Sequence, residues 1–171
     1  MALWQQLRRV VYATTPLVRV ALIAWLLGAT AYGQQPIEQV DVAIIVHADN
    51  ELTALTLDQA RALFNLKKRF WSNGKSVQVI LPSREVPERA VLLDKVYGLS
   101  AEQLADKWRQ RIFAGEIITV PTGAPSREFL LHAVESNIGA ISAVSASAVS
   151  GKVRVIRLDG KLPGESGYPL R

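Results

Sequence analysis

Cysteine is absent from this chain of 171 residues, which also has only two histidines and one methionine. Without cysteine, the protein cannot form disulfides, thiolate nucleophiles or cysteine metal sites. Two histidines without a His–Glu spacing do not indicate a metal site. The chain also lacks the glycine-rich loops that bind nucleotides and the Gly-x-Ser-x-Gly turn of serine hydrolases. The sequence therefore predicts neither an enzyme nor a protein with a cofactor.

Long apolar runs are also absent, and the N-terminal one, Val20 to Leu27, is shorter than the roughly 20 residues of a membrane-spanning helix. Three arginines precede it, and small residues follow as far as Gly33. A basic segment, a short apolar run and a small-x-small site are typical of a secretory signal. We predict that residues 1–33 are a signal peptide and that the rest is exported to the periplasm. If residues 1–33 are not cleaved, they form an N-terminal anchor, and the rest of the chain is still exported.

Strong charge of either sign is missing from the rest of the chain. Without the three arginines of the leader, 17 of the 20 basic residues remain against 15 acidic ones, a net charge of +2. Proteins that bind nucleic acid usually carry clustered basic residues and a higher net charge. The composition therefore excludes nucleic acid as the expected partner.

Strand and helix patterns alternate after the leader. Val42 to Val46 is an uninterrupted β-branched run, which is typical of a strand buried on both faces. Thr56 and Gln59 form one capping box and Ser100 and Gln103 another. Expected strands cover residues 42–46, 77–81, 117–120, 138–142 and 153–156. Expected helices cover residues 57–65, residues 87–97, a segment after Ser100, and a segment from Ser126 to about Asn137. The helix after Ser100 carries Leu104, Trp108, Ile112 and Phe113 on one side.

This alternation predicts one α/β domain over residues 34–158, with three layers and a central, mostly parallel sheet. We expect Pro121 to Pro125 to form a turn and residues 145–149 to form one helical turn. Residues 159–171 are rich in glycine and proline and show no apolar period. They are expected to form a loosely ordered tail.

Three segments resemble a known family. Residues 55–71 (LTLDQARALFNLKKRFW) resemble the L-T-x-x-Q-[LV]-x-x-I-F-x-G-K-x-x-x-W stretch of the periplasmic phosphate-binding proteins of ABC transporters. Residues 42–55 (VAIIVHADNELTAL) are similar to the strand and loop before it, and residues 135–142 (ESNIGAIS) to the later x-x-P-G-[AS]-I-G-Y. The chain looks like a small, single-domain phosphate-binding-like protein. The resemblance implies a fold like one lobe of a type II periplasmic binding protein.

The family's oxyanion-binding R-x-D-x-S-G-T segment aligns with residues 83–89 (SREVPER). Arg84 matches its arginine, but Val86, Pro87 and Glu88 replace the Ser-Gly-Thr amides. Proline has no N–H, and a carboxylate repels an anion, so this segment offers fewer donors than the family's loop. Glu85 adds a second carboxylate beside it.

Strand ends and helix starts supply the candidate anion-binding residues, because these are the positions where α/β sheets bind anions. The candidates are Ser83, Arg84, Ser126, Arg127 and Ser142. Two structural alternatives remain open: Arg84 pairs with Glu85 or Glu88, or Ser126 is simply a helix cap.

A basic, aromatic turn gives a second candidate region. The predicted partner surface consists of Lys67, Lys68, Arg69 and Trp71, and the alternative is a solvated turn over a packed tryptophan. We expect an exported solute-binding-like domain that binds phosphate or another small oxyanion for transport or sensing. The alternative is a periplasmic interaction or regulatory module of the same fold that has lost its ligand. The implied protein partners are a membrane transporter, a sensor or a second binding subunit.

Overall fold

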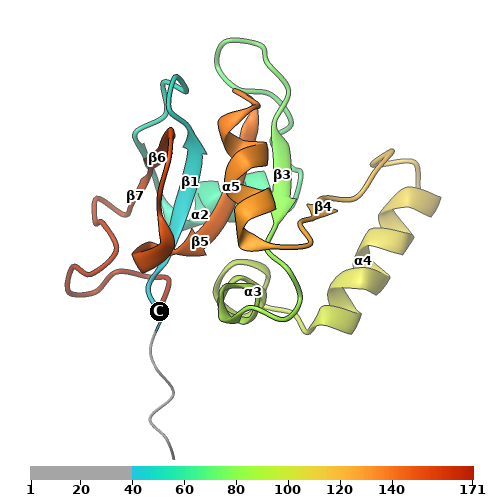
Figure 1. Ribbon diagram of the computed structural model, residues 1–171. Helices are drawn as coiled ribbons and strands as arrows, with labels where there is room; N and C mark the ends of the chain where they lie inside the picture. The colour runs from blue at the N-terminus through green and yellow to red at the C-terminus, as the bar shows by residue number, and fades with distance from the viewer. Residues whose placement is uncertain (1–39) are drawn as a thin grey trace, which may run out of the picture. The chain divides into compact units, whose positions relative to one another are not determined.

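A five-stranded sheet organises residues 40–171, the part of the chain that the structure, a computed structural model, describes (Figure 1). Its strand order is β4-β3-β5-β1-β6. The strands are β1 (Val42–His47), β3 (Gln78–Leu81), β4 (Thr122–Gly123), β5 (Ala140–Ser145) and β6 (Val153–Val155). β3 pairs in parallel with β4 and β5, whereas β1 pairs antiparallel with β5 and β6. Four of these five strands therefore run in one direction, which confirms a mostly parallel sheet.

Capping residues begin the helices where the sequence predicts them. In both capping boxes, the hydroxyl of Thr56 or Ser100 accepts from a backbone N–H, and the side chain of Gln59 or Gln103 accepts in return. Ser126 caps a third helix. The helices are α2 (Leu57–Phe64), α3 (Pro87–Val91), a π-helical continuation η1 (Leu92–Tyr97), α4 (Ala101–Phe113), α5 (Arg127–Glu135) and a short 3-10 turn η2 (Ala146–Ala148).

Successive side chains of β1 enter two different cores. Val42, Ile44 and Val46 lie in one core, Ala43 and Ile45 lie in the other, and all five are fully buried. The first core also holds side chains of α2, η1 and α4, and the second holds side chains of α5. The sheet is therefore covered on both faces, which explains the uninterrupted apolar run in β1. A small parallel pair, β2 (Ala54–Leu55) and β7 (Arg157–Leu158), flanks the first core.

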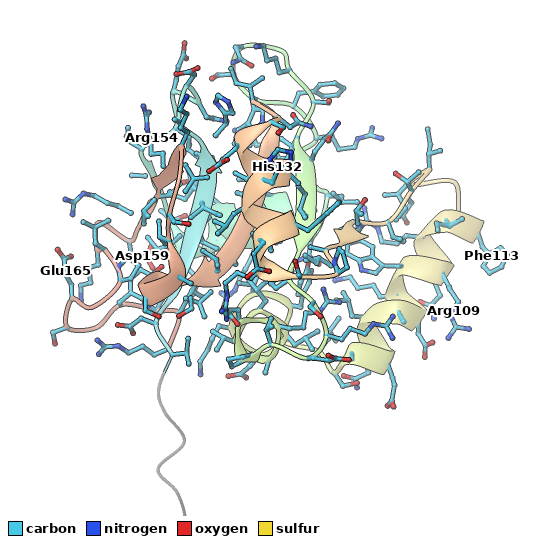
Figure 2. The ribbon with its side chains drawn as sticks, in the orientation of Figure 1. Arg109, Phe113, His132, Arg154, Asp159 and Glu165 are labelled. Atoms are coloured by element: carbon cyan, nitrogen blue, oxygen red, sulfur yellow. The ribbon has the colours of Figure 1, made fainter. Side chains whose placement is uncertain are left out.

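The region after α4 differs from the sequence-based expectation. Residues 117–120 do not form a strand; β4 forms instead at Thr122–Gly123, within the predicted turn. The reason is that the chain reaches the edge of β3 only there, where Ile80 pairs with Thr122. The apolar side expected on α4 also ends early, since Ile112 and Phe113 are 41% and 88% exposed. Figure 2 shows Phe113 projecting away from the sheet at the far end of α4.

The C-terminal tail is ordered, so the expectation of a loose segment over residues 159–171 is wrong. Tyr168 and Leu170 are buried in the first core. The Tyr168 hydroxyl donates to the Val42 carbonyl at 2.7 Å, and the Val42 N–H donates to the Leu170 carbonyl at 3.0 Å. Arg171 also forms an ion pair with Asp41. The glycines and prolines of the tail form turns that bring these side chains back to β1.

The predicted signal peptide, residues 1–33, lies outside the described residues. Within residues 40–171, no helix combines the length and the apolar composition that crossing a membrane requires. Residues 40–171 belong to one compact unit, which contains the sheet.

Gly139→Ala is expected to lower the free energy of unfolding by about 1–3 kcal/mol, the usual cost of overpacking. A Cβ at this position would overlap the backbone carbonyl oxygen of Ser76. Relief of this overlap requires the backbone to move. That movement would also disturb the Gly139 carbonyl, which accepts from the Trp71 indole at 3.0 Å and from the Gln78 N–H at 2.9 Å. Urea unfolding followed by tryptophan fluorescence measures the effect. Gly123→Ala is the matched control because its Cβ would meet open space, and equal unfolding midpoints for the two variants would contradict the prediction.

Candidate functional site

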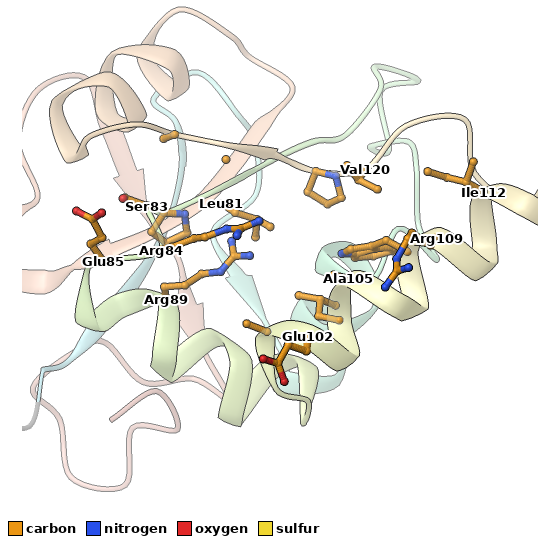
Figure 3. A pocket seen from close by; sticks show the side chains of 17 residues that line it. Leu81, Ser83, Arg84, Glu85, Arg89, Glu102, Ala105, Arg109, Ile112 and Val120 are labelled. Carbon is orange, nitrogen blue, oxygen red and sulfur yellow. The ribbon is translucent and has the colours of Figure 1, made fainter.

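A cleft of about 900 Å³ opens at the carboxyl ends of the parallel strands β3 and β4 (Figure 3). The loop after β3 and the start of α3 form one wall, α4 forms the opposite wall, and the segment leading into β4 closes a third side. Ligands of open α/β sheets bind at this edge, because loops and helix starts converge there. The cleft is therefore the first place to look for the predicted anion site.

Two arginines enter the cleft side by side. Arg84 lies in the loop after β3, Arg89 lies in α3, and Figure 3 shows both side chains extending toward α4. Neither forms an ion pair with any residue of the described segment. The Nε of Arg89 is buried and has no hydrogen-bond partner within residues 40–171. The site thus holds two positive charges that form no ion pair with any carboxylate of residues 40–171.

The pKa of Arg89 is lowered by burial and, in part, by the positive charge of the neighbouring Arg84. Burial lowers the pKa of its guanidinium, Tyr97 opposes this, and the positive charge of Arg84 lowers the pKa further. An arginine stays charged in proteins, so the consequence is repulsion between the two guanidiniums. An anion held between them would relieve this repulsion and satisfy the free donors.

Acidic groups are also present at the rim of the cleft. Glu85 and Glu102 line it, but neither lies within ion-pair distance of Arg84 or Arg89. Figure 3 shows the Glu85 carboxylate turned away from the two arginine side chains. Arg109, on α4, pairs with Asp106. The expected alternative in which Arg84 pairs with Glu85 or Glu88 is therefore not what the structure shows.

The structure separates the predicted anion-binding residues into three places. Ser83 and Arg84 line the cleft. Ser126 caps α5, where its hydroxyl accepts from the Phe129 N–H, and it does not line the cleft. Ser142 is fully buried, and its hydroxyl donates to the Ile80 carbonyl at 2.6 Å, so it ties β5 to β3. Only the first pair is placed to meet a ligand.

Arg127 is occupied by a buried carboxylate. Its guanidinium donates to Glu88 Oε1 at 2.8 and 3.2 Å, and the Ser145 N–H donates to the same oxygen at 2.9 Å. Glu88 is only 1% exposed. Burial raises its pKa, but hydrogen bonds from its own backbone and that of Ser145, together with Arg127, outweigh burial and lower the pKa overall. The ion pair with Glu88 therefore occupies the Arg127 guanidinium, which leaves little attraction there for a second anion.

Sequence reasoning missed Arg89 and part of the role of Trp108. Arg89 lies in the segment aligned with the family's binding loop, but it has no counterpart in the motif, and only the fold brings it beside Arg84. The sequence places Trp108 on the apolar side of the helix after Ser100; it is 6% exposed and also lines the cleft. Residues 40–171 contain no cluster of three or more histidine, aspartate or glutamate side chains that could hold a metal ion.

The exposed aromatic residue of the predicted partner surface is Phe70 and not Trp71. Lys67, Lys68 and Arg69 are exposed, and Phe70 beside them is 59% exposed. Trp71, by contrast, is buried, and its indole N–H donates to the Gly139 carbonyl at 3.0 Å. The inclusion of Trp71 in that surface is therefore wrong, because the indole packs into the first core.

No protein-family model matches the chain, and no curated protein matches its sequence. Similar solved structures include a candidate phosphate ABC transporter substrate-binding protein with bound phosphate from Clostridium perfringens (TM-score 0.59, 21% identity, 72% of this chain and 47% of that chain). Others are an ABC-type phosphate transport receptor from Vibrio cholerae (TM-score 0.60, 18% identity, 72% and 48%) and PstS from Borrelia burgdorferi (TM-score 0.59, 9% identity, 77% and 54%).

The chain spans about half the length of the solved structures it matches. At these identities the likeness concerns the fold, and it confirms the architecture expected from the three sequence motifs. The described residues therefore have the α/β fold found in about half of a phosphate-transport substrate-binding protein.

Proposed function

We propose that this protein is a solute-binding-like domain that binds phosphate or a related small oxyanion in the cleft, between Arg84 and Arg89. The observation that carries the proposal is the adjacency of these two guanidiniums without an ion-pair partner among residues 40–171. The similar structures support it, because they are described as phosphate-binding or phosphate-transport proteins and not as enzymes. The proposal includes export to the periplasm through residues 1–33.

The expected affinity is moderate. A charge-assisted hydrogen bond contributes about 1.5–3 kcal/mol net, and the cleft offers two arginines but no run of backbone amides, since Pro87 lacks an N–H. Such a donor set corresponds to dissociation constants between about a micromolar and a millimolar. We also propose that the domain works with a second binding subunit, a sensor or a membrane transporter, since the similar structures include phosphate-transport proteins.

Calorimetric titration of the full chain with phosphate, with sulfate for comparison, tests the proposal at low ionic strength. Arg84→Ala and Arg89→Ala are each expected to weaken phosphate binding about ten- to a hundredfold, because each removes one charged donor. Arg69→Ala is the matched control: it removes an exposed arginine of the basic turn, outside the cleft. Its phosphate affinity should equal that of the wild type.

Absence of heat up to millimolar phosphate or sulfate, with a protein that circular dichroism shows to be folded, would overturn the oxyanion proposal. The second candidate function, an interaction or regulatory module without a ligand, would then take its place. One observation favours that candidate: three consecutive basic residues, Lys67, Lys68 and Arg69, stand exposed beside the exposed ring of Phe70. Such a surface suits an acidic protein partner.

A further inference from the structure

The cleft is much larger than an inorganic oxyanion. At about 30 Å³ for each water molecule of the liquid, a volume of about 900 Å³ corresponds to roughly 30 waters. It lies in the range of about 300–1,000 Å³ that is usual for sites that take drug-sized organic molecules. A phosphate ion between Arg84 and Arg89 would fill only one part of it.

The rest of the cleft is mainly apolar. Its apolar lining includes Leu104, Trp108, Ile112, Val120 and Pro121. Ile112 lies on α4 and Val120 on the segment that leads into β4 (Figure 3), and they are 41% and 44% exposed. Two large aliphatic side chains thus stand partly exposed within the same cleft as the arginine pair. A ligand that covered them would gain affinity from the apolar surface it buries.

Trp108, which lines the apolar part of the cleft, holds a second buried donor without a partner among residues 40–171. The Trp108 indole Nε1 is buried and has no hydrogen-bond partner among residues 40–171, although the ring itself packs edge-on against Tyr97. A buried indole N–H usually has an acceptor.

We propose that the cleft binds an organic phosphate, a phosphate monoester with an apolar or aromatic group, in preference to inorganic phosphate. The phosphoryl group lies between Arg84 and Arg89, and the organic group lies along Trp108, Ile112 and Val120. This inference rests on the proposed function, because it uses the same arginine pair for the charged end. It adds the class of molecule that the rest of the cleft accepts.

Calorimetric titration of the full chain with phenyl phosphate and with inorganic phosphate tests the inference. Phenyl phosphate is expected to bind at least about tenfold more tightly, because its ring buries apolar surface that inorganic phosphate leaves exposed. Ile112→Ser and Val120→Ser should each reduce this preference severalfold. The matched controls are Phe113→Ser and Ile118→Ser, which change neighbouring side chains, 88% and 91% exposed, that do not line the cleft.

The possible results separate the inference from the proposed function. Equal affinity for the two ligands would overturn the inference and leave the oxyanion site standing. A preference for phenyl phosphate that the Ile112 and Val120 variants do not reduce would also overturn it, because the ring would then lie elsewhere. Failure of both ligands to bind would overturn the proposed function as well.

Discussion

Deletion of residues 168–171 is expected to lower the free energy of unfolding by at least about 5 kcal/mol. Truncating a buried aromatic side chain costs about 3–5 kcal/mol and a buried leucine about 2–5 kcal/mol, and the deletion removes Tyr168 and Leu170 together. Because whole domains are stable by only about 5–15 kcal/mol, the truncated protein should be largely unfolded at room temperature. Far-ultraviolet circular dichroism and urea unfolding measure this directly.

The reason lies in the pairing of β1. β6 reaches only the second half of β1, from Ile45 to His47. At the start of the strand, the polar backbone groups of Val42 pair instead with the Leu170 carbonyl and the Tyr168 hydroxyl. Without the tail, these groups and one side of the first core would be left without partners.

Two single variants act as controls for the truncation. Tyr168→Phe removes only the hydroxyl that bonds to Val42, so it should cost about 1 kcal/mol. Arg171→Ala breaks a solvent-screened ion pair with Asp41 and should hardly change the unfolding midpoint. An unfolding midpoint of the truncated protein equal to that of Arg171→Ala would show that the tail does not hold the core.

Local patterns in the sequence are enough to predict most of the elements, since their causes are local. A capping box needs only Thr56 and Gln59, and a strand buried on both faces needs only the run from Val42. The tail and β4 have causes that are distant in the sequence. Tyr168 is buried because β1, some 126 positions away, needs a partner, and β4 forms where the chain meets the edge of β3. Glycine and proline mark turns in both segments but do not show what the turns bring together.

The sequence likewise predicts some features of the candidate site and not others. Arg84 could be found from the aligned segment, and the carboxyl edge of the sheet could be inferred from the α/β pattern. The partners of Arg84 and Arg127 could not be predicted, because each arginine is followed directly by a glutamate in the sequence. In the folded protein, Glu88 pairs with Arg127, which lies 39 positions away in the sequence, and Arg84 lies beside Arg89. A charge count along the chain does not distinguish these two outcomes.

Glu88→Ala is expected to lower the free energy of unfolding by about 3–5 kcal/mol, as in other proteins in which one partner of a buried ion pair is removed. The variant leaves the Ser145 N–H buried without an acceptor and separates Arg127 from its counter-ion. Glu88→Gln keeps the size of the side chain and an oxygen that can accept from Ser145. It should therefore cost less, about 1–2 kcal/mol. Urea unfolding of the two variants at neutral pH gives both values.

The pH dependence of unfolding distinguishes the charge of Glu88 from its shape. Because the pKa of Glu88 is lowered in the folded protein, its ionised form stabilises the fold fully above the unfolded pKa of about 4.3, and this stabilisation is lost as the pH falls through the folded pKa. The difference in unfolding free energy between the wild type and Glu88→Gln should therefore be constant from about pH 8 to pH 5 and shrink below about pH 4. A difference that stays constant down to pH 3 would mean that packing alone, and not the ion pair with Arg127, accounts for the contribution of Glu88.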